Sequence, residues 1–313
     1  MNETRLPNFF IVGAPKAGTT SLYHHLRQHP DIYMSPLKET SYFSNEFRVE
    51  NLVSDLEGIG RQSQAELRRY LDTHPLGDRF GGMVTEWRDY LSLFEQAGME
   101  SAIGEASPGY LWSRTAALRI AQVAPHARII MILRNPVERA FSQYMQMSNT
   151  GPYRLTFEEH IAACLAERST DRISMVYPFL EYGLYSEQLD RYLATFPRSQ
   201  LGIWLYEETL LPGFLQQVFE FLGVNAEFMP DTSKRYLEQH IPRITYLSRL
   251  AAHPAVASTL QMLVPETIRP MLKRIEFHEL LKHRDGAQLI VSVILLEPDP
   301  NFPGKGIEEI ETL

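Results

Sequence analysis

The chain has 313 residues, of which 44% are hydrophobic and 22% are charged, as in a soluble globular protein with a large core. Its 30 basic and 38 acidic residues give a net charge of −8, which excludes a globally basic surface of the kind that binds nucleic acid. The single cysteine, Cys164, excludes an intramolecular disulfide and fits a reducing compartment. We expect Cys164 to be a buried apolar side chain.

The chain opens with a strand, a loop and a helix in direct succession. Residues 8–12 form a short apolar run, residues 13–18 form a loop bounded by glycines, and a helix is expected over residues 18–29. Pro30 ends that helix, because proline disfavours helical backbone at the residue before it. Residues 31–34 are a candidate second strand.

Residues 45–100 are predicted to be helices and polar connections inserted between core strands, where insertions often shape a substrate cleft. Helices are expected at residues 62–73 and 87–94, and the segment 74–82, rich in glycine and proline, is expected to be a loop. Most aromatic residues of this insertion and of the segment after it are expected to lie in the core; they are Trp87, Tyr90, Phe94, Tyr110 and Trp112.

Strands and helices alternate after the insertion, which predicts a mostly parallel central sheet with right-handed crossovers. The expected strands are residues 101–105, 128–133 and 201–206, and the expected helices are 111–123, from Pro136 onward, 157–167, 184–195 and 211–222, the last closed by Gly223. We therefore predict an α/β fold of the P-loop type with helices flanking the sheet. A single domain is expected over residues 1–313, with a core at 8–225 and a helical or irregular extension at 226–313.

No apolar run reaches the roughly 18 residues that a membrane-spanning helix needs. The most apolar segment, residues 288–296, is too short and is interpreted as a buried strand or a helix face. The first residues, MNETRLPNFFIVG, lack the basic region and long apolar core of a signal peptide. The chain is therefore expected to be soluble and cytoplasmic.

The first loop has the properties of a phosphate cradle. It reads GAPKAGTTS, and backbone N–H groups at the helix N-terminus after it hold anions at the positive end of the helix dipole. The loop has the G-x4-G length of a Walker A motif, but Thr19 follows the second glycine, and the lysine, Lys16, lies inside the loop. This argues against an ordinary nucleoside triphosphatase and favours a different phosphate ligand.

A second motif follows further along the chain, where residues 128–142 read RIIMILRNPVERAFS. Between the two motifs lie KETSYF, which starts at Lys38, and GEASPGY, which starts at Gly104. The first loop resembles the 5′-phosphosulfate loop of sulfotransferases that use 3′-phosphoadenosine-5′-phosphosulfate (PAPS). Residues 128–142 are similar to the 3′-phosphate element of that family, and the shorter motifs resemble its heparan sulfate and bacterial branch. The likeness covers residues 8–225.

The resemblance implies transfer of a sulfuryl group from PAPS to a hydroxyl or amine, with release of adenosine 3′,5′-bisphosphate and without an obligatory metal. Lys16 then neutralises the bridging oxygen as its bond to sulfur breaks. Arg134 and Ser142 are implied to bind the 3′-phosphate, for which a guanidinium is well suited. The implied contacts of the first loop to the donor come from Lys16, Ala17, Gly18, Thr19, Thr20 and Ser21.

Glu39 matches the glutamate that acts as general base in the heparan sulfate branch. Lys38 is a candidate contact to the donor or acceptor. Glu105 is a second acid in the same region, and the choice between Glu39 and Glu105 as the base is left open. Tyr185 is expected either near the cleft or in the core, and Arg139 is expected to face outward from its helix.

The histidines, including the adjacent His24 and His25 on the first helix, show no compelling metal-ligand spacing, so no metal site is predicted. The late Lys-Gly-rich loop of the heparan sulfate enzymes is not found, and Lys234-Arg235 or Arg243 are candidate replacements. Many eukaryotic carbohydrate sulfotransferases carry an N-terminal anchor, whereas this chain starts almost directly at its first strand, so a bacterial enzyme is expected.

The function as a whole has two alternatives, and two further properties are left open. A kinase-like P-loop enzyme and a non-catalytic binding protein on a sulfotransferase fold are the two competing functions. The acceptor is open among small molecules, lipids and carbohydrates, and the oligomeric state is open as well.

Overall fold

A computed structural model describes residues 5–150, 155–167 and 172–233. All of these residues belong to the first 239 residues of the chain. The apolar segment 288–296 and the candidate lid residues Lys234, Arg235 and Arg243 lie outside the described residues. The single domain expected over residues 1–313 stays a prediction.

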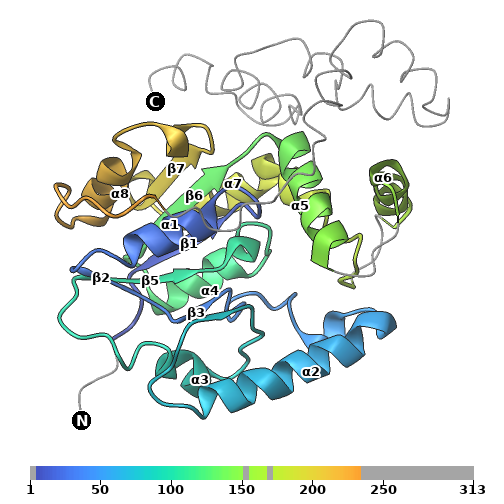
Figure 1. Ribbon diagram of the computed structural model, residues 1–313, viewed down its shortest axis with the longest axis horizontal. Helices are drawn as coiled ribbons and strands as arrows, with labels where there is room; N and C mark the ends of the chain where they lie inside the picture. Colours follow the sequence, from blue (N-terminus) through green and yellow to red (C-terminus); the bar gives the residue numbers. More distant parts are fainter. Residues whose placement is uncertain (1–4, 151–154, 168–171, 234–313) are drawn as a thin grey trace, which may run out of the picture. The chain divides into compact units, whose positions relative to one another are not determined.

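Five parallel strands form the central sheet in the order β2-β5-β1-β6-β7 (Figure 1). Their bounds are β1 Phe9–Gly13, β2 Ile32–Met34, β5 Ala102–Ala106, β6 Arg128–Leu133 and β7 Leu201–Leu205. All residues of β1 and β5 are buried, as expected for strands of a parallel sheet that is covered on both faces. The α/β fold with a mostly parallel sheet is thereby confirmed.

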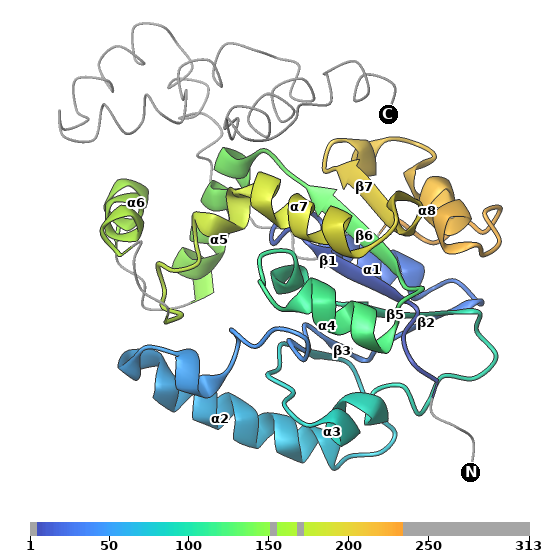
Figure 2. The same ribbon diagram turned by 180° about the vertical axis from the view of Figure 1, so that it is seen from behind.

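Helices cover both faces of this sheet. Helix α1 (Thr19–Leu26) lies on the face seen in Figure 1, and α4 (Ala116–Val123) and α7 (Tyr185–Thr195) lie on the face seen in Figure 2. After β1 the chain runs to β2 at one edge of the sheet, and after β6 it runs to β7 at the opposite edge. Because right-handed connections are expected for both, the helices that follow β1 and β6 lie on opposite faces. The carboxyl ends of β1 and β6 therefore form the crevice where open α/β sheets bind ligands.

The remaining helices confirm most of the predicted elements. Their bounds are α2 Ser54–Leu71, α3 Trp87–Ser92, α5 Pro136–Thr150, α6 Phe157–Ala166 and α8 Phe214–Leu222. Helix α8 ends at Gly223, which adopts a left-handed conformation with φ of 69°. None of the helices in the described ranges combines the length and apolarity needed to cross a bilayer.

Two short strands were not predicted. Strand β3 (Leu37–Lys38) pairs in parallel with β4 (Arg79–Phe80), which lies inside the segment expected to be a loop. Strands of two residues are too short to show an alternating pattern. The pairing places Lys38 directly beside Phe80.

Three helices begin three or more residues away from the predicted start, and one of them is α8, which starts at Phe214 instead of residue 211 because the left-handed Gly213 precedes it. Helix α2 starts at Ser54 instead of residue 62, because Gly58 and Gly60 obscure its helical periodicity. Helix α4 starts at Ala116 instead of residue 111, because the Ser113 hydroxyl accepts the backbone N–H of Ala116 at 3.1 Å and so fixes a turn before the helix.

The core contains most of the aromatic residues expected there. Tyr90, Phe94 and Tyr110 are at most 1% exposed and Trp112 is 9% exposed, whereas Trp87 is 37% exposed. Cys164 is buried as expected, and burial raises the pKa of its thiol to about 12, so the thiol is inert at neutral pH.

Candidate active site

The loop between β1 and α1 has an unusual backbone. Gly13 packs so closely under Leu111 that a Cβ atom at this position would overlap the leucine side chain. Gly18 is left-handed with φ of 85°, and Lys16 is left-handed with φ of 66°. A lysine rarely adopts this conformation, and such strain persists only where the surrounding structure enforces it.

The first turn of α1 is arranged to receive an anion. Gly18 occupies the N-cap position, no side chain of the described structure caps this end, and the first turn contains no acidic residue. The N–H groups of such a turn lack partners within the helix and carry the positive end of its dipole. Thr19 is buried, while Thr20 and Ser21 are partly exposed beside it.

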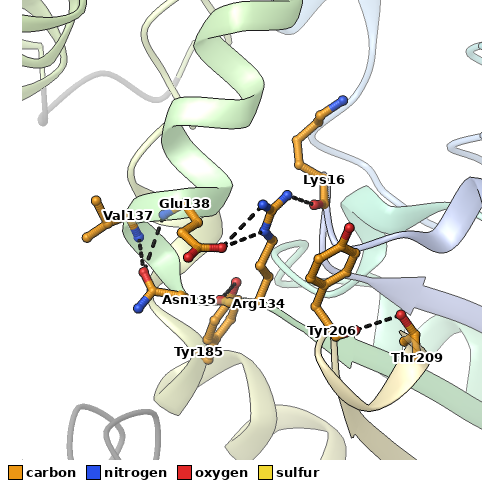
Figure 3. Close-up of polar contacts among 8 residues, drawn as sticks. All are labelled: Lys16, Arg134, Asn135, Val137, Glu138, Tyr185, Tyr206 and Thr209. Carbon is orange, nitrogen blue, oxygen red and sulfur yellow. Dashed lines mark hydrogen bonds and ion pairs between the residues drawn. The ribbon is translucent and has the colours of Figure 1, made fainter. Parts of the chain in front are cut away.

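Arg134 lies at the carboxyl end of β6, next to this loop. Its Nη1 atom donates to the carbonyl oxygen of Lys16 at 3.1 Å, and its guanidinium lies 4.5 Å from the centre of the Tyr206 ring (Figure 3). Its other terminal nitrogen forms an ion pair with Glu138 at 3.2 Å. The two motifs predicted from sequence therefore meet at one edge of the sheet.

The corner between β6 and α5 is fixed by side chains on both sides. The Oδ1 atom of Asn135 accepts the N–H groups of Val137 at 3.0 Å and Glu138 at 3.3 Å, which caps α5 (Figure 3). The Tyr185 hydroxyl donates to the carbonyl oxygen of Arg134 at 2.8 Å. Tyr185 is thus buried and supports the Arg134 backbone.

Helix α5 also reaches the lysine of the loop. Ser142 lies on this helix, and one turn later the Gln146 Oε1 atom accepts the Lys16 ammonium at 2.9 Å. Sequence reasoning did not identify Gln146 or Tyr206. Gln146 could have been found because it lies one helical turn after Ser142, on the same face of the helix. Tyr206 could have been found because it directly follows β7.

The charges around Lys16 are mainly positive. Burial lowers the pKa of its ammonium, and the Arg134 and Lys38 cations lower it further, while the Glu39 carboxylate opposes them. Lys16, Arg134 and Lys38 outnumber the two carboxylates that pair with them, Glu39 and Glu138, and this excess of positive charge favours an anionic ligand.

Glu39 lies at the carboxyl end of β5, beside the loop. Its backbone N–H donates to the Ala106 carbonyl at 2.8 Å, and its φ of 66° places it in the left-handed region. Its carboxylate accepts the Lys38 ammonium at 2.5 Å. The Glu39 side chain is 48% exposed and the Lys38 side chain only 1%, so the carboxylate is open to an incoming molecule while its cation is not.

Phe80 covers the buried lysine. The Lys38 ammonium lies 5.5 Å from the centre of the Phe80 ring, and Phe80 is 49% exposed. The ring shields the cation from water on one side and presents its other side to solvent.

Glu105 is fully buried, which separates it from Glu39. Its carboxylate accepts the hydroxyls of Ser107 at 2.6 Å and Thr40 at 2.7 Å on one oxygen, and that of Tyr90 at 2.7 Å on the other. Burial raises the pKa of the Glu105 carboxyl, and the three hydroxyls oppose this shift. The geometry favours Glu39 as the acid that can reach a substrate.

Arg139 does not face outward as predicted; it is 0% exposed. Its guanidinium donates to the Gln143 Oε1 atom and to the Phe179 carbonyl oxygen, each at 2.5 Å. It also lies against the rings of Phe179 and Tyr182. A charged residue on an amphipathic helix is usually exposed, and the segment that buries this one is remote in sequence.

A cavity of about 100 Å³ opens beside α5. Its lining residues are Gln143, Ile173, Ser174, Met175, Tyr177, Pro178, Phe179 and Tyr182. Burial raises the pKa of the Tyr182 hydroxyl, Arg139 opposes the shift, and the Glu39 carboxylate adds to it. The Glu39 charge thus acts on the pKa of one residue of the cavity lining.

Within residues 5–150, 155–167 and 172–233, no three His, Cys, Asp or Glu side chains are grouped so that they could hold a metal ion. The absence of a metal requirement stays a prediction. The residues gathered at the sheet edge fit a phosphate-bearing ligand.

Known proteins resemble this chain over most of the described region. A family model described as "Sulfotransferase family" matches residues 7–199. The crystal structure of a sulfotransferase from Alicyclobacillus acidocaldarius is 32% identical, with a TM-score of 0.61, and the match covers 82% of this chain and 96% of that one.

Two curated human proteins are also similar. Carbohydrate sulfotransferase 15 is 28% identical in an alignment of length 254 that covers 70% of this chain and 44% of that protein. Heparan sulfate glucosamine 3-O-sulfotransferase 6 is 26% identical in an alignment of length 285 that covers 86% of this chain and 71% of that protein. The chain thus spans less than half the length of the first relative.

Proposed function

This chain belongs to the sulfotransferase family, and on that premise we propose that it transfers a sulfuryl group from PAPS to a hydroxyl group of a carbohydrate. The product of the donor would be adenosine 3′,5′-bisphosphate. The observation that carries this proposal is the convergence of Lys16 and Arg134, from two distant motifs, on an uncapped helix N-terminus. A carbohydrate acceptor is supported by the names of the two human relatives.

The donor would bind across the crevice between β1 and β6. The 5′-phosphate would lie on the first turn of α1, with the N–H groups of Gly18, Thr19 and Thr20 as donors. Arg134, directly after β6, and Ser142, within α5, would hold the 3′-phosphate. Donor binding would replace the contact of Arg134 with Glu138 by a contact with phosphate.

The chemical step then needs a cation and a base. As the bond from sulfur to the bridging oxygen breaks, the negative charge left on the phosphate oxygen would be stabilised by the Lys16 ammonium. The acceptor hydroxyl oxygen forms the new bond to sulfur, and its proton passes to the Glu39 carboxylate. Lys38 would hold that carboxylate in place through the bond at 2.5 Å.

The acceptor would lie between Phe80 and the cavity beside α5. An exposed aromatic ring on one side, and the tyrosine, serine and glutamine of the cavity on the other, suit a ring that bears hydroxyl groups. Lipid and other small-molecule acceptors are the competing outcomes. The cytoplasmic location, the bacterial source and the absence of a nucleic-acid partner stay predictions.

Two measurements test the proposal. Calorimetry should show adenosine 3′,5′-bisphosphate binding more tightly than ATP, with losses in Lys16→Ala and Arg134→Ala. Labelled PAPS with a panel of sugars, lipids and phenols should show turnover that Glu39→Gln lowers by a factor on the order of 10² or more, without loss of nucleotide affinity. Preference for ATP with magnesium would favour a kinase-like enzyme instead, and nucleotide binding without turnover of any acceptor would favour a binding protein.

A further inference from the structure

The segment that contains Glu39 is held in a strained conformation. Two of its residues, Glu39 with φ of 66° and Ser41 with φ of 56°, are left-handed without being glycine. Such a segment returns to more common backbone angles unless neighbouring groups hold it.

Backbone hydrogen bonds hold this segment from two sides. The Glu39 N–H donates to Ala106, at the end of β5. On the other side, the N–H groups of Gly82 and Val84 donate to the carbonyl oxygens of Glu39 at 2.9 Å and Thr40 at 3.0 Å. These bonds fix the path of the backbone. Two of their donors, however, belong to the glycine-rich connection after β4, which has no regular structure of its own.

A buried carboxylate provides the side-chain anchor. The Thr40 hydroxyl, one residue after Glu39, donates to the Oε1 atom of Glu105 at 2.7 Å, and both side chains are 0% exposed. Ser107 and Tyr90 donate to the same carboxylate. Three hydroxyl donors around two oxygens are the pattern expected of an ionised carboxylate, which only accepts hydrogen bonds.

The charge of Glu105 sets the direction of a longer chain of hydrogen bonds. Because the Thr40 hydroxyl donates to Glu105, its lone pairs are left for the Tyr42 N–H at 3.2 Å and the Tyr110 hydroxyl at 2.9 Å. The Tyr110 hydroxyl in turn accepts the N–H of Phe43 at 3.2 Å. One carboxylate thus orders the Thr40 side chain and, through it, the backbone N–H groups of Tyr42 and Phe43.

We propose that Glu105 is a positioning residue, whose ionised carboxylate at the end of β5 fixes residues 39–43 and thereby holds Glu39 where it meets the acceptor. The inference rests on the proposed function, in which Glu39 receives the proton. Glu105 itself does not touch the substrate, because it is fully buried. Loss of its charge would loosen the placement of Glu39, and small displacements of a catalytic group cost rate.

The chain contains a matched control in Glu46. This carboxylate also accepts a set of short hydrogen bonds, from Ser44 at 2.9 Å, Ser113 at 2.7 Å and the Arg114 N–H at 2.7 Å. It anchors the turn before α4, and its link to residues 39–43 is indirect, through the Thr115 hydroxyl, which lies 3.2 Å from the Glu46 carboxylate and 3.3 Å from the Phe43 carbonyl oxygen. Its replacement should affect stability without a specific effect on the chemical step.

The first readout does not depend on activity. Amide hydrogen exchange should rise in the peptide that contains residues 39–43 in Glu105→Gln, because the amide group that replaces one oxygen cannot accept all three hydroxyls. The same rise is expected in Thr40→Val, which removes the hydroxyl at constant shape, and not in Thr40→Ser or Glu46→Gln. Unchanged exchange in both Glu105→Gln and Thr40→Val would overturn the proposal.

The second readout is the split between binding and chemistry. Glu105→Gln and Thr40→Val should lower kcat by about tenfold to a hundredfold, with affinity for adenosine 3′,5′-bisphosphate within about twofold of the parent, and Thr40→Ser should restore kcat. If Glu105→Gln does not fold, the Thr40 pair tests the same hydrogen bond. Loss of nucleotide affinity in step with kcat, or an equal loss of kcat in Glu46→Gln, would show a general structural role and refute positioning.

Failure of the proposed function has a different signature. A parent protein that binds no nucleotide would contradict the proposed function, and a Glu39→Gln variant with full kcat would contradict the role of Glu39 as base. Both conclusions hold whatever the rate of amide hydrogen exchange in residues 39–43. Raised exchange together with unchanged kcat in Glu105→Gln would refute the positioning role alone.

Discussion

The guanidinium of Arg134 donates a hydrogen bond to the carbonyl oxygen of Lys16 across 118 residues of sequence. Lys16 is a left-handed residue of its loop without being glycine, so Arg134 supports a strained backbone in addition to its proposed contact with phosphate. The Tyr206 ring contacts the same guanidinium, with its centre 4.5 Å away. Arg134 therefore couples the two halves of the proposed donor site.

Arg134→Lys should bind adenosine 3′,5′-bisphosphate more weakly than the parent by about tenfold to a hundredfold, although the charge is kept. A lysine cannot contact the Lys16 carbonyl and a phosphate with a rigid planar fork, and a lost hydrogen bond to a charged group is worth about 1.5–3 kcal/mol. Calorimetry measures the change. Affinity equal to that of the parent would show that only charge at this position matters.

Glu138→Gln should bind the same nucleotide slightly more tightly. Glu138 competes for the Arg134 guanidinium, but its side chain is 58% exposed, and exposed pairs of this spacing are worth only about 0.3–0.5 kcal/mol. The expected gain is about twofold at low salt and should shrink as salt screens the pair. Titrations at two salt concentrations check this, and weaker binding by Glu138→Gln would contradict the competition.

The sequence predicted the elements that depend on local pattern. Strand β6 and the start of α5 were placed at the correct residues, because a continuous apolar run followed by Asn-Pro is a strong local signal. The family resemblance located Lys16, Arg134 and Glu39 on three separate segments, and the sheet order then brings these segments to one edge.

The missed features depend on neighbours that are distant in sequence. Arg139 is buried only because residues 179–182 fold over it, and no pattern within α5 reveals that. The same holds for β3 and β4, which become strands only through each other. The local pattern around Glu105 likewise does not show that three hydroxyls surround it.

Lys16→Met should leave the ligand-free protein at least as stable as the parent at neutral pH, while abolishing turnover. Burial first, and then the Arg134 and Lys38 cations, lower the pKa of Lys16 below its usual 10.5, so the folded protein holds this proton less tightly than the unfolded chain does. The charged lysine therefore opposes folding fully below its folded-state pKa, and this penalty disappears as the pH rises from there toward 10.5.

Thermal unfolding of the parent and of Lys16→Met at several pH values measures this effect. The Tm of the variant should exceed that of the parent most at neutral pH, and this difference in Tm should narrow at alkaline pH. The loss of the bond between Lys16 and Gln146 makes the difference smaller. Gln146→Ala is the control for that lost bond. A variant whose relative stability improves as the pH rises would have the opposite sign and would contradict the proposed electrostatic strain.

Met175→Trp should raise KM for the acceptor without changing affinity for adenosine 3′,5′-bisphosphate. Met175 lines the cavity beside α5 and is 45% exposed, so an indole can fill that space without entering the core. Phe80→Ala should act in the same direction from the other side of Glu39, because it removes the exposed ring. Leu210→Trp is the matched control, since Leu210 is 70% exposed and does not line the cavity.

Steady-state kinetics with the acceptor varied at saturating PAPS separates these effects. A several-fold rise in KM with kcat little changed is expected for Met175→Trp, because uniform binding of the acceptor is lost while Lys16 and Glu39 are untouched. Phe80→Ala should lower kcat as well as raise KM, since its ring also shields the Lys38 ammonium that holds Glu39. If Met175→Trp and Phe80→Ala both keep the parent KM, as the Leu210→Trp control should, the acceptor binds elsewhere, and the cavity has no part in its recognition.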